Sequence, residues 1–203
     1  MYFVKTPWWL KRLYPGLTWD IASKNKDLFL TFDDGPHPVA TPFVLDVLKQ
    51  YNAKATFFCI GKNIVQYPEI YDRICKEGHR IGNHTYDHLN GWKTRDDVYY
   101  KNVLQAKEVI ESDLFRPPYG RITKAQVRQI SPLFKIIMWD VLSGDFDVDL
   151  STEKSLQYVT RKSKPGSIIV FHDSEKAFRI LQYVLPEVLQ FFKDKGYSFK
   201  AIE

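Results

Sequence analysis

Short runs of apolar residues alternate along this chain with segments in which apolar residues recur every three or four positions. Successive side chains of a strand point to opposite faces, whereas a helix repeats after about 3.6 residues, so the two patterns are distinguishable. The short apolar runs predict seven strands, at residues 28–32, 55–60, 80–82, 114–116, 135–139, 167–171 and 198–202.

Helical spacing marks three of the intervening segments. The first two helices are predicted from apolar stripes at residues 43, 44, 47, 48 and 51 and at residues 98, 104, 109 and 110. The third, at residues 176–195, contains Pro186, where we expect a break or kink because proline lacks the backbone N–H that a helix needs.

The alternation of strands and helices predicts an α/β fold with a parallel sheet. With 203 residues, no low-complexity linker and no internal repeat, the chain is expected to form one domain, at residues 27–203. Residues 1–26 are aromatic and basic, and we expect them to pack on this domain. An anchor in a membrane interface is the alternative for this segment.

Composition narrows the classes of partner. The chain is 44% hydrophobic and 26% charged, as in soluble globular proteins, and its formal charge of +5 is scattered rather than striped, which argues against nucleic acid. No apolar run approaches the roughly 18 residues of a membrane span, and no signal peptide is visible, so the compartment stays open. We expect a monomer.

Cys59 and Cys75 are expected to be thiols, with one disulfide as the alternative.

Polar side chains follow the predicted strands at the same end each time. In parallel α/β folds the reactive groups gather at the carboxyl ends of strands, so this repetition predicts a site there. The residues concerned are Asp33 and Asp34, His84 and His88, Arg116, Asp140 and Asp145, and His172.

The pair Asp33-Asp34 directly follows the first apolar strand. Two adjacent carboxylates repel each other and are costly to desolvate, which indicates metal binding or proton transfer. The following Gly35-Pro36 lets the backbone turn, so both side chains can face one site. An acidic turn or helix cap is the alternative interpretation of this pair alone.

His84 and His88 stand at positions i and i+4, which share a face if the segment is helical. Taken alone, such a pair is more often surface or core than ligand. Together with Asp34 it forms a set of two imidazoles and one carboxylate that leaves coordination positions open, as in catalytic sites. Zinc is the expected ion, with cobalt or nickel as alternatives for the same ligands.

Four motifs in order resemble the polysaccharide deacetylase family: Thr31-Phe-Asp-Asp-Gly-Pro36, His84-Thr-Tyr-Asp-His88, Arg116-Pro-Pro-Tyr-Gly120 and the late His172. The resemblance extends over about residues 27–202. It implies a distorted (β/α) barrel of about seven parallel strands and metal-dependent removal of acetyl groups from N-acetylated sugars.

The resemblance also implies a role for each matching residue. Asp34, His84 and His88 would hold the ion; Asp33 would be the general base, positioned by Arg116; and His172 would be the general acid. The Tyr119 backbone amide would bind the oxyanion, and the substrate region would include Pro118, Trp139 and Phe146. His37 and His79 are interpreted as structural.

The motif after the fifth predicted strand departs from the family pattern of an acidic residue followed by tryptophan. Here Asp145-Phe146 stands at that place. Asp145 would still accept the ring N–H of His172, but Phe146 lacks an indole N–H, so the substrate cleft is expected to differ.

The expected substrate is an acetylated oligo- or polysaccharide, and the acetyl groups removed are those of N-acetylglucosamine units in chitin oligomers or peptidoglycan. Two alternatives stay open: an O-acetyl esterase acting on acetylxylan, and a carbohydrate-binding protein without catalysis. Because an alkoxide leaves more easily than an amine, the same site suits either reaction.

Overall fold

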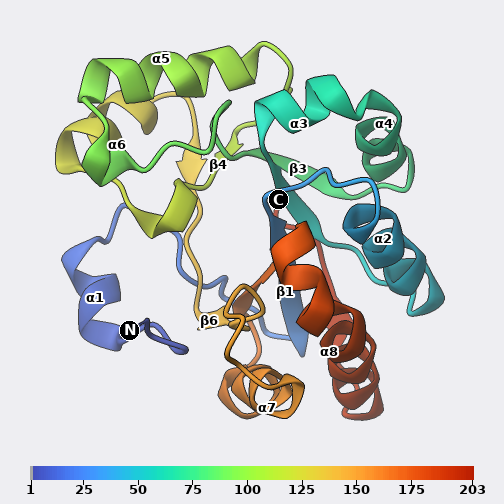
Figure 1. Cartoon of the computed structure of the whole chain (residues 1–203). Helices are drawn as coiled ribbons and strands as arrows, with labels where there is room; N and C mark the ends of the chain where they lie inside the picture. Colours follow the sequence, from blue (N-terminus) through green and yellow to red (C-terminus); the bar gives the residue numbers. More distant parts are fainter. Residues whose placement is uncertain (1) are drawn as a thin grey trace.

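Parallel strands form the centre of this computed structural model, which describes residues 2–203 (Figure 1). Seven of them follow the order β5-β4-β3-β2-β1-β7-β6 and curl into a half-barrel, while β8 pairs with the start of β1. The predicted α/β fold of about seven parallel strands is therefore confirmed. The strands are β1 (Asp27–Asp33), β2 (Thr56–Cys59), β3 (Arg80–Asn83), β4 (Leu114–Phe115), β5 (Lys135–Ile136), β6 (Val141–Leu142), β7 (Ile168–His172) and β8 (Ser198–Phe199).

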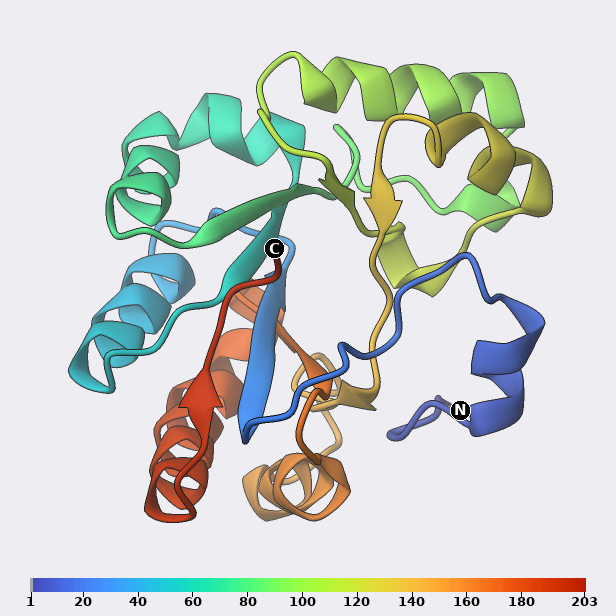
Figure 2. The same ribbon diagram turned by 180° about the vertical axis from the view of Figure 1, so that it is seen from behind.

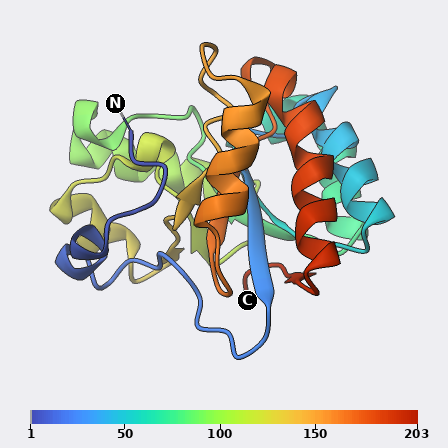
Figure 3. The same ribbon diagram turned by 90° about the horizontal axis from the view of Figure 1, so that it is seen from below.

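Helices surround the strands on the outside of the half-barrel (Figures 2 and 3). Two short 3-10 helices, η1 (Gly91–Lys93) and η2 (Pro118–Gly120), lie in the connections around α5 and α6. The α-helices are α1 (Trp8–Leu13), α2 (Ala40–Gln50), α3 (Gly61–Gln66), α4 (Pro68–Lys76), α5 (Asp96–Lys107), α6 (Lys124–Ile130), α7 (Thr152–Lys162) and α8 (Glu175–Asp194). None of the helices within residues 2–203 is long and apolar enough to cross a membrane.

All seven predicted strands are present, but β6 was not predicted as a strand of its own. The predicted strand at residues 135–139 ends at Ile136, and the sheet resumes at Val141–Leu142. Two-residue strands are too short to show a periodicity. Of the break or kink predicted at Pro186, the break is wrong, because α8 continues through this residue and buries Val184, Leu185 and Val188. The predicted stripe of α5 is wrong in part, since Val98 is exposed and the helix ends before residue 109.

Successive side chains of β1 point alternately to the core shared with the helices and to the interior of the half-barrel. Leu28, Leu30 and Phe32 belong to the core shared with the helices, and Phe32 stacks on rings from both neighbouring strands. Phe29 belongs instead to a cluster formed by other strands and the chain end. Because side chains alternate, Thr31 and Asp33 point to the same interior side as Phe29. This parity directs Asp33 into the half-barrel.

The N-terminal segment, defined here as residues 2–20, lies along the opening of the half-barrel. β5 and β6 do not pair with each other; instead isolated bridges join Thr18 to Ile137 and Lys5 to Val141. Pairing with this segment covers backbone groups that an open sheet leaves unsatisfied.

Asp140 does not join the polar cluster predicted at the strand ends. It is fully buried and binds the N-terminal segment, with Lys5 Nζ at 2.5 Å and Lys11 Nζ at 2.6 Å. Ser167 Oγ also donates to it, at 2.6 Å. A buried carboxylate needs such partners, and here they come from the chain's own N-terminal segment. Cys59 and Cys75 are free thiols.

Candidate metal centre and catalytic cavity

Asp33 and Asp34 reach the same cavity because the backbone turns sharply at Asp34. Asp33 is the last residue of β1, and Asp34 has a φ of 81° in the left-handed region. Its backbone is held by Asn63 Nδ2, which donates to the Asp34 carbonyl at 2.8 Å. Gly35 follows at a point where an added Cβ would lie 2.1 Å from Asp173 Oδ2, so only glycine fits. The expectation that both carboxylates face one site is met by this turn.

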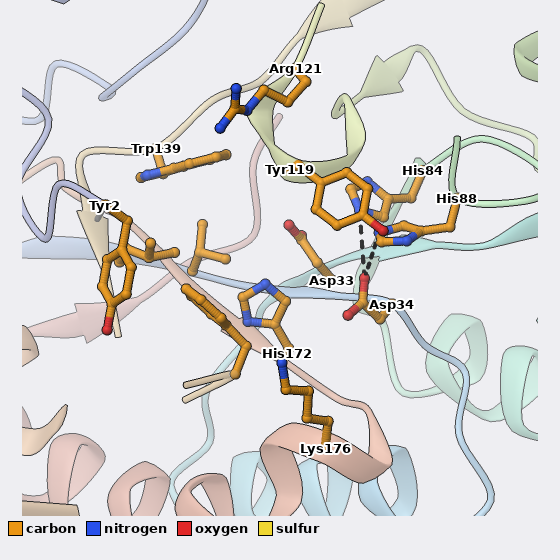
Figure 4. Close-up of a pocket in the computed structure, with 13 residues that line it drawn as sticks. Tyr2, Asp33, Asp34, His84, His88, Tyr119, Arg121, Trp139, His172 and Lys176 are labelled. Atoms are coloured by element: carbon orange, nitrogen blue, oxygen red, sulfur yellow. Dashed lines mark ion pairs between the residues drawn. The ribbon is translucent and has the colours of Figure 1, made fainter. Parts of the chain in front are cut away.

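Asp34, His84 and His88 converge on one point (Figure 4). The Nε2 atoms of His84 and His88 lie 3.7 and 3.1 Å from Asp34 Oδ1, and one ligand atom from each residue lies within 4.8 Å of the others. The condition of a helical segment is not met: His84 to His88 form a loop in which Thr85 and His88 have φ values of 64° and 59°. Two left-handed residues, rather than a helical turn, bring the imidazoles together.

The chemistry of these three side chains fits a divalent cation. Nδ1 of His84 lies 2.8 Å from the Arg116 carbonyl, which fixes the proton on Nδ1 and leaves Nε2 as a lone-pair donor. Burial lowers the pKa of His84 to about 4, so the ring is neutral. Asp34 Oδ1 is buried and has no hydrogen-bond partner within residues 2–203. An unpartnered buried carboxylate oxygen facing two imidazoles is the donor set that a divalent ion takes.

The pKa of Asp34 also favours the charged form required for coordination. Burial by itself raises this pKa, but the neighbouring imidazoles of His88, His172 and His84 outweigh it and lower the pKa below its usual range. Asp34 is therefore a carboxylate at neutral pH.

Arg116 is completely buried behind Asp33. Its Nη1 donates to Asp33 Oδ1 and to Thr31 Oγ1, each at 2.7 Å, and its other nitrogens donate to the carbonyls of Ile137 and Met138. The guanidinium also lies 4.1 Å from the centre of the Phe58 ring. Thr31 and Asp33 lie in β1 and Phe58 lies in β2, so these contacts hold Asp33 in one orientation.

His172 lies across the cavity from the metal-ligand candidates and is held by Asp145. Asp33 and His172 are register partners on the adjacent strands β1 and β7, which places them at the same end of the sheet. His172 Nδ1 lies 2.8 Å from Asp145 Oδ1, and the His172 backbone N–H donates to Asp145 Oδ2 at 2.7 Å. Burial alone lowers the pKa of His172, but Asp145, Asp34 and Asp33 outweigh it and raise the pKa to about 9. The ring is therefore protonated at neutral pH, with Nδ1 bound to Asp145.

The cavity has a volume of about 430 Å³ and opens between these groups (Figure 4). Among the sequence-predicted residues, Asp33, Asp34, His84, His88, Tyr119, Trp139, Phe146 and His172 line it. Arg116 and Asp145 lie behind the lining and act on it through Asp33 and His172, and Pro118 is buried within η2.

Five further residues line the cavity that were not predicted for the site. Val170 is two residues before His172 on β7, so strand parity alone predicts its position. Arg121 directly follows Gly120, the last residue of the Arg116–Gly120 motif, and Lys176 lies in the first turn of α8. Tyr2 and Leu142 are brought in by tertiary contacts, which no local sequence signal shows. The five are Tyr2, Arg121, Leu142, Val170 and Lys176.

The turn that contains Tyr119 lies at the edge of the cavity, which Tyr119 lines. Tyr119 has a φ of 60°, and its ring lies 4.7 Å from that of His88. The hydrogen bonds of this turn are donated by Gly120 and Arg121 to the carbonyls of Pro117 and Pro118. The oxyanion role of the Tyr119 N–H stays a prediction.

His37, His79 and Asp173 make contacts outside the cavity lining. His37 Nδ1 accepts the backbone N–H groups of Val39 and Ala40 at the start of α2. His79 Nδ1 accepts the Ala55 N–H at 3.3 Å. Asp173 accepts the Gly35 N–H at 3.1 Å and the Thr41 hydroxyl at 2.5 Å, and so fixes the turn that follows Asp34.

Comparison with known proteins agrees with this geometry. The profile of the family described as polysaccharide deacetylase matches residues 20–133. A peptidoglycan-N-acetylglucosamine deacetylase of Bacillus cereus is 34% identical over 193 residues, covering 92% of this chain and 91% of the relative. A chitooligosaccharide deacetylase of Azorhizobium caulinodans is 32% identical over 161 residues, covering 75% of this chain and 76% of the relative.

A solved structure is similar over nearly the whole chain. The crystal structure of the Bc1960 peptidoglycan N-acetylglucosamine deacetylase, in complex with 4-naphthalen-1-yl-N-oxidanyl-benzamide, superposes with a TM-score of 0.82 at 33% identity. The match covers 97% of this chain and 95% of that one. Sequence, fold and the Asp-His-His arrangement thus agree, and the chain belongs to the polysaccharide deacetylase family.

Proposed function

We propose that this polysaccharide deacetylase hydrolyses the acetamido group of N-acetylglucosamine units in peptidoglycan or chitin-type glycans. The observation that carries the proposal is the placement of Asp33 and His172 around one cavity beside the Asp34, His84 and His88 cluster. Amide hydrolysis needs an activated water, a proton donor for the leaving amine and stabilisation of the oxyanion, and the cavity offers a group for each need.

The three candidate ligands would hold a divalent cation, with zinc as the expected ion. A divalent cation at this position lowers the pKa of water and stabilises negative charge on a carbonyl oxygen. Two imidazoles and one carboxylate leave coordination positions open for water and substrate. Cobalt and nickel accept the same ligands, so the metal content of the purified enzyme is the measurement that identifies the native ion.

Asp33 is proposed as the general base. It takes a proton from the attacking water while Arg116, at 2.7 Å, holds the carboxylate in one orientation. The Tyr119 N–H donates a hydrogen bond to the oxygen that becomes negative as water adds to the acetyl carbon.

His172 is proposed as the general acid. Asp145 keeps the ring protonated, so His172 donates a proton to the nitrogen as the C–N bond breaks. The products are acetate and a free amine on the sugar, and the proton taken by Asp33 balances the one given by His172.

Both relatives support the substrate class. One is named for peptidoglycan N-acetylglucosamine and the other for chitooligosaccharide, and both sugars carry the same acetamido group. Arg121 and Lys176 add positive charge at the cavity, which suits the carboxylates of peptidoglycan better than neutral chitin.

The test is acetate release by the zinc-loaded enzyme from peptidoglycan, chitopentaose and acetylxylan. We expect release from the two N-acetylated substrates, its loss with a chelator, and its loss in Asp33→Asn. Asp149→Asn is the matched control and should retain activity, because Asp149 is exposed and its carboxylate has no side-chain partner in the described part of the chain, residues 2–203. Faster release from acetylxylan would make the protein an O-acetyl esterase instead. No release from any substrate by the metal-loaded protein would leave the carbohydrate-binding interpretation.

A further inference from the structure

A second cavity, of about 360 Å³, adjoins the catalytic cavity. The two share the lining residues Tyr2, Tyr119, Arg121, Trp139 and Leu142. One wall of the second cavity comes from the N-terminal segment and the other from the region of η1 and η2. We call this second cavity the aromatic groove, after the rings of Phe3, Tyr14, Trp19, Trp92, Tyr119 and Trp139 that line it.

Several of these rings face solvent. Phe3 is 59% exposed, Tyr14 36%, and Trp92 and Tyr119 60% each. Leaving large rings in water is unfavourable, and a concentration of them in one concave site indicates a ligand that covers them. Pyranose rings have one face of C–H groups, which packs on an aromatic ring while the hydroxyls stay hydrated.

The wall formed by the N-terminal segment is held in place before any ligand binds. The Thr6 N–H donates to the Asp140 carbonyl at 2.9 Å, and the Leu142 N–H donates to the Val4 carbonyl at 2.9 Å. Both Lys5 and Lys11 bind the buried carboxylate of Asp140. A preformed wall loses little conformational entropy on binding, so its contacts translate into affinity.

The opposite wall is built on Trp92 and Arg121. The Arg121 guanidinium lies 4.1 Å from the centre of the Trp92 ring, and Trp92 Nε1 donates to the Ile122 carbonyl at 3.1 Å. Arg121 and Trp139 both line the junction of the two cavities (Figure 4). Its guanidinium makes no ion pair or hydrogen bond with side chains of residues 2–203, so its N–H groups remain available.

We propose that the aromatic groove binds the sugar unit next to the one whose acetamido group occupies the catalytic cavity. Tyr14 and Trp92 supply ring faces for this second unit, and Arg121 donates hydrogen bonds to oxygens near the linkage between the two units. We infer this occupant because the two cavities are joined through five shared lining residues. A linear glycan with one unit in the catalytic cavity has to extend out of it, and the aromatic groove adjoins that cavity. The inference rests on the proposed function, and it makes the enzyme selective for extended chains.

The test compares kcat/KM for acetate release from chitopentaose and from the monosaccharide N-acetylglucosamine, which has no neighbouring unit to fill the groove. The wild type should prefer the longer substrate, and the ratio of the two values should fall roughly three- to tenfold in Tyr14→Ala and in Trp92→Ala, since one aromatic contact contributes about 0.5–1.5 kcal/mol. Tyr14→Phe keeps the ring and should keep the ratio. Trp8→Ala removes an aromatic side chain that is 73% exposed on the same segment but does not line the groove, and it should also keep the ratio.

Binding measured by calorimetry separates this inference from the proposed function. In the background of Asp33→Asn, where turnover is lost, Tyr14→Ala should weaken the binding of chitopentaose, while Tyr14→Phe should not. Equal affinity for chitopentaose with and without Tyr14→Ala in the Asp33→Asn background would contradict sugar binding in the groove. A wild-type enzyme without preference for the longer substrate would contradict it as well. If the wild type releases no acetate from any glycan, the proposed function fails, and calorimetry still decides whether the groove binds the chain.

Discussion

His172 Nδ1 lies 2.8 Å from Asp145 Oδ1, and the same carboxylate accepts the His172 backbone N–H through its other oxygen at 2.7 Å. Asp145 thereby fixes both the ring and the main chain at the end of β7. It also raises the pKa of His172 to about 9, against the lowering effect of burial. The family pattern places tryptophan after this aspartate, and here Phe146 packs its ring 5.2 Å from that of His172 instead.

Replacing Asp145 should move the alkaline limb of the pH profile. The reaction requires protonated His172, so kcat/KM falls as pH rises through the pKa of that ring. Asp145→Asn removes the charge that raises this pKa, and the limb should shift to lower pH by about one unit or more. A bound divalent cation beside Asp34 places the wild-type limb below 9 in the loaded enzyme.

The measurement is kcat/KM against pH for the zinc-loaded wild type, Asp145→Asn and the surface control Asp149→Asn. The acidic and alkaline limbs belong to the coupled site rather than to single residues, so the shift is judged between variants. An alkaline limb at the same pH in Asp145→Asn and wild type would exclude His172 as the acid supported by Asp145.

Arg116 should matter as much for stability as for activity. It is completely buried and pairs with Asp33, which is also buried. Arg116→Met leaves that carboxylate without its partner, and breaking a buried pair in this way costs about 3–5 kcal/mol. We expect a corresponding loss in the free energy of urea-induced unfolding. The double variant Arg116→Met/Asp33→Asn should recover part of it, because no unpaired charge remains. A single variant as stable as the wild type would contradict this account.

Much of the site could be predicted from the sequence because its residues lie at strand ends, where short apolar runs are followed by polar side chains. Asp33, Asp34 and His172 were placed correctly by this rule. His84 and His88 also lie at the predicted site, but two left-handed residues rather than a helical turn bring them together, and the i, i+4 spacing carries no sign of that. Asp140 also follows an apolar run in the sequence, but it does not join the site. It pairs instead with Lys5 and Lys11, more than a hundred residues away along the chain.

The walls of the cavities were the least predictable part. Tyr2 and Leu142 meet only because the N-terminal segment pairs with the chain around β6. That strand has two residues, and a pairing this short leaves no periodic signal. Contacts of this kind depend on the closure of the half-barrel, which local propensity does not determine.

Asp173 should make the metal-free protein sensitive to pH. Burial, reinforced by the charges of Asp34 and Asp33, raises the pKa of Asp173 to about 8, above its value of 3.8 in an unfolded chain. The folded state therefore holds a proton that the unfolded state loses, so this contribution to stability is complete below pH 3.8 and is lost as pH rises toward 8. Asp173→Asn imitates the protonated form and should gain stability relative to the wild type, by more than about 1 kcal/mol, between pH 5 and pH 8. Urea unfolding at both pH values with a chelator present is the measurement, and a constant difference between the two proteins would contradict the raised pKa.

Adding zinc to the metal-free protein should raise its melting temperature. Among residues 2–203, Asp34 Oδ1 is buried without a hydrogen-bond partner. A cation that binds only the folded state stabilises that state by mass action, by about 2.7 kcal/mol at a concentration of 100 times Kd. His84→Ala and His88→Ala each remove one candidate ligand and should lose most of this shift. His37→Ala alters a histidine that caps α2 and should keep the zinc-dependent part of the shift even if its baseline stability is lower. Calorimetric scans with and without zinc provide the comparison, together with the metal content of each protein after dialysis. A zinc shift of equal size in His84→Ala and wild type would place the ion elsewhere and remove the centre on which the proposed chemistry depends.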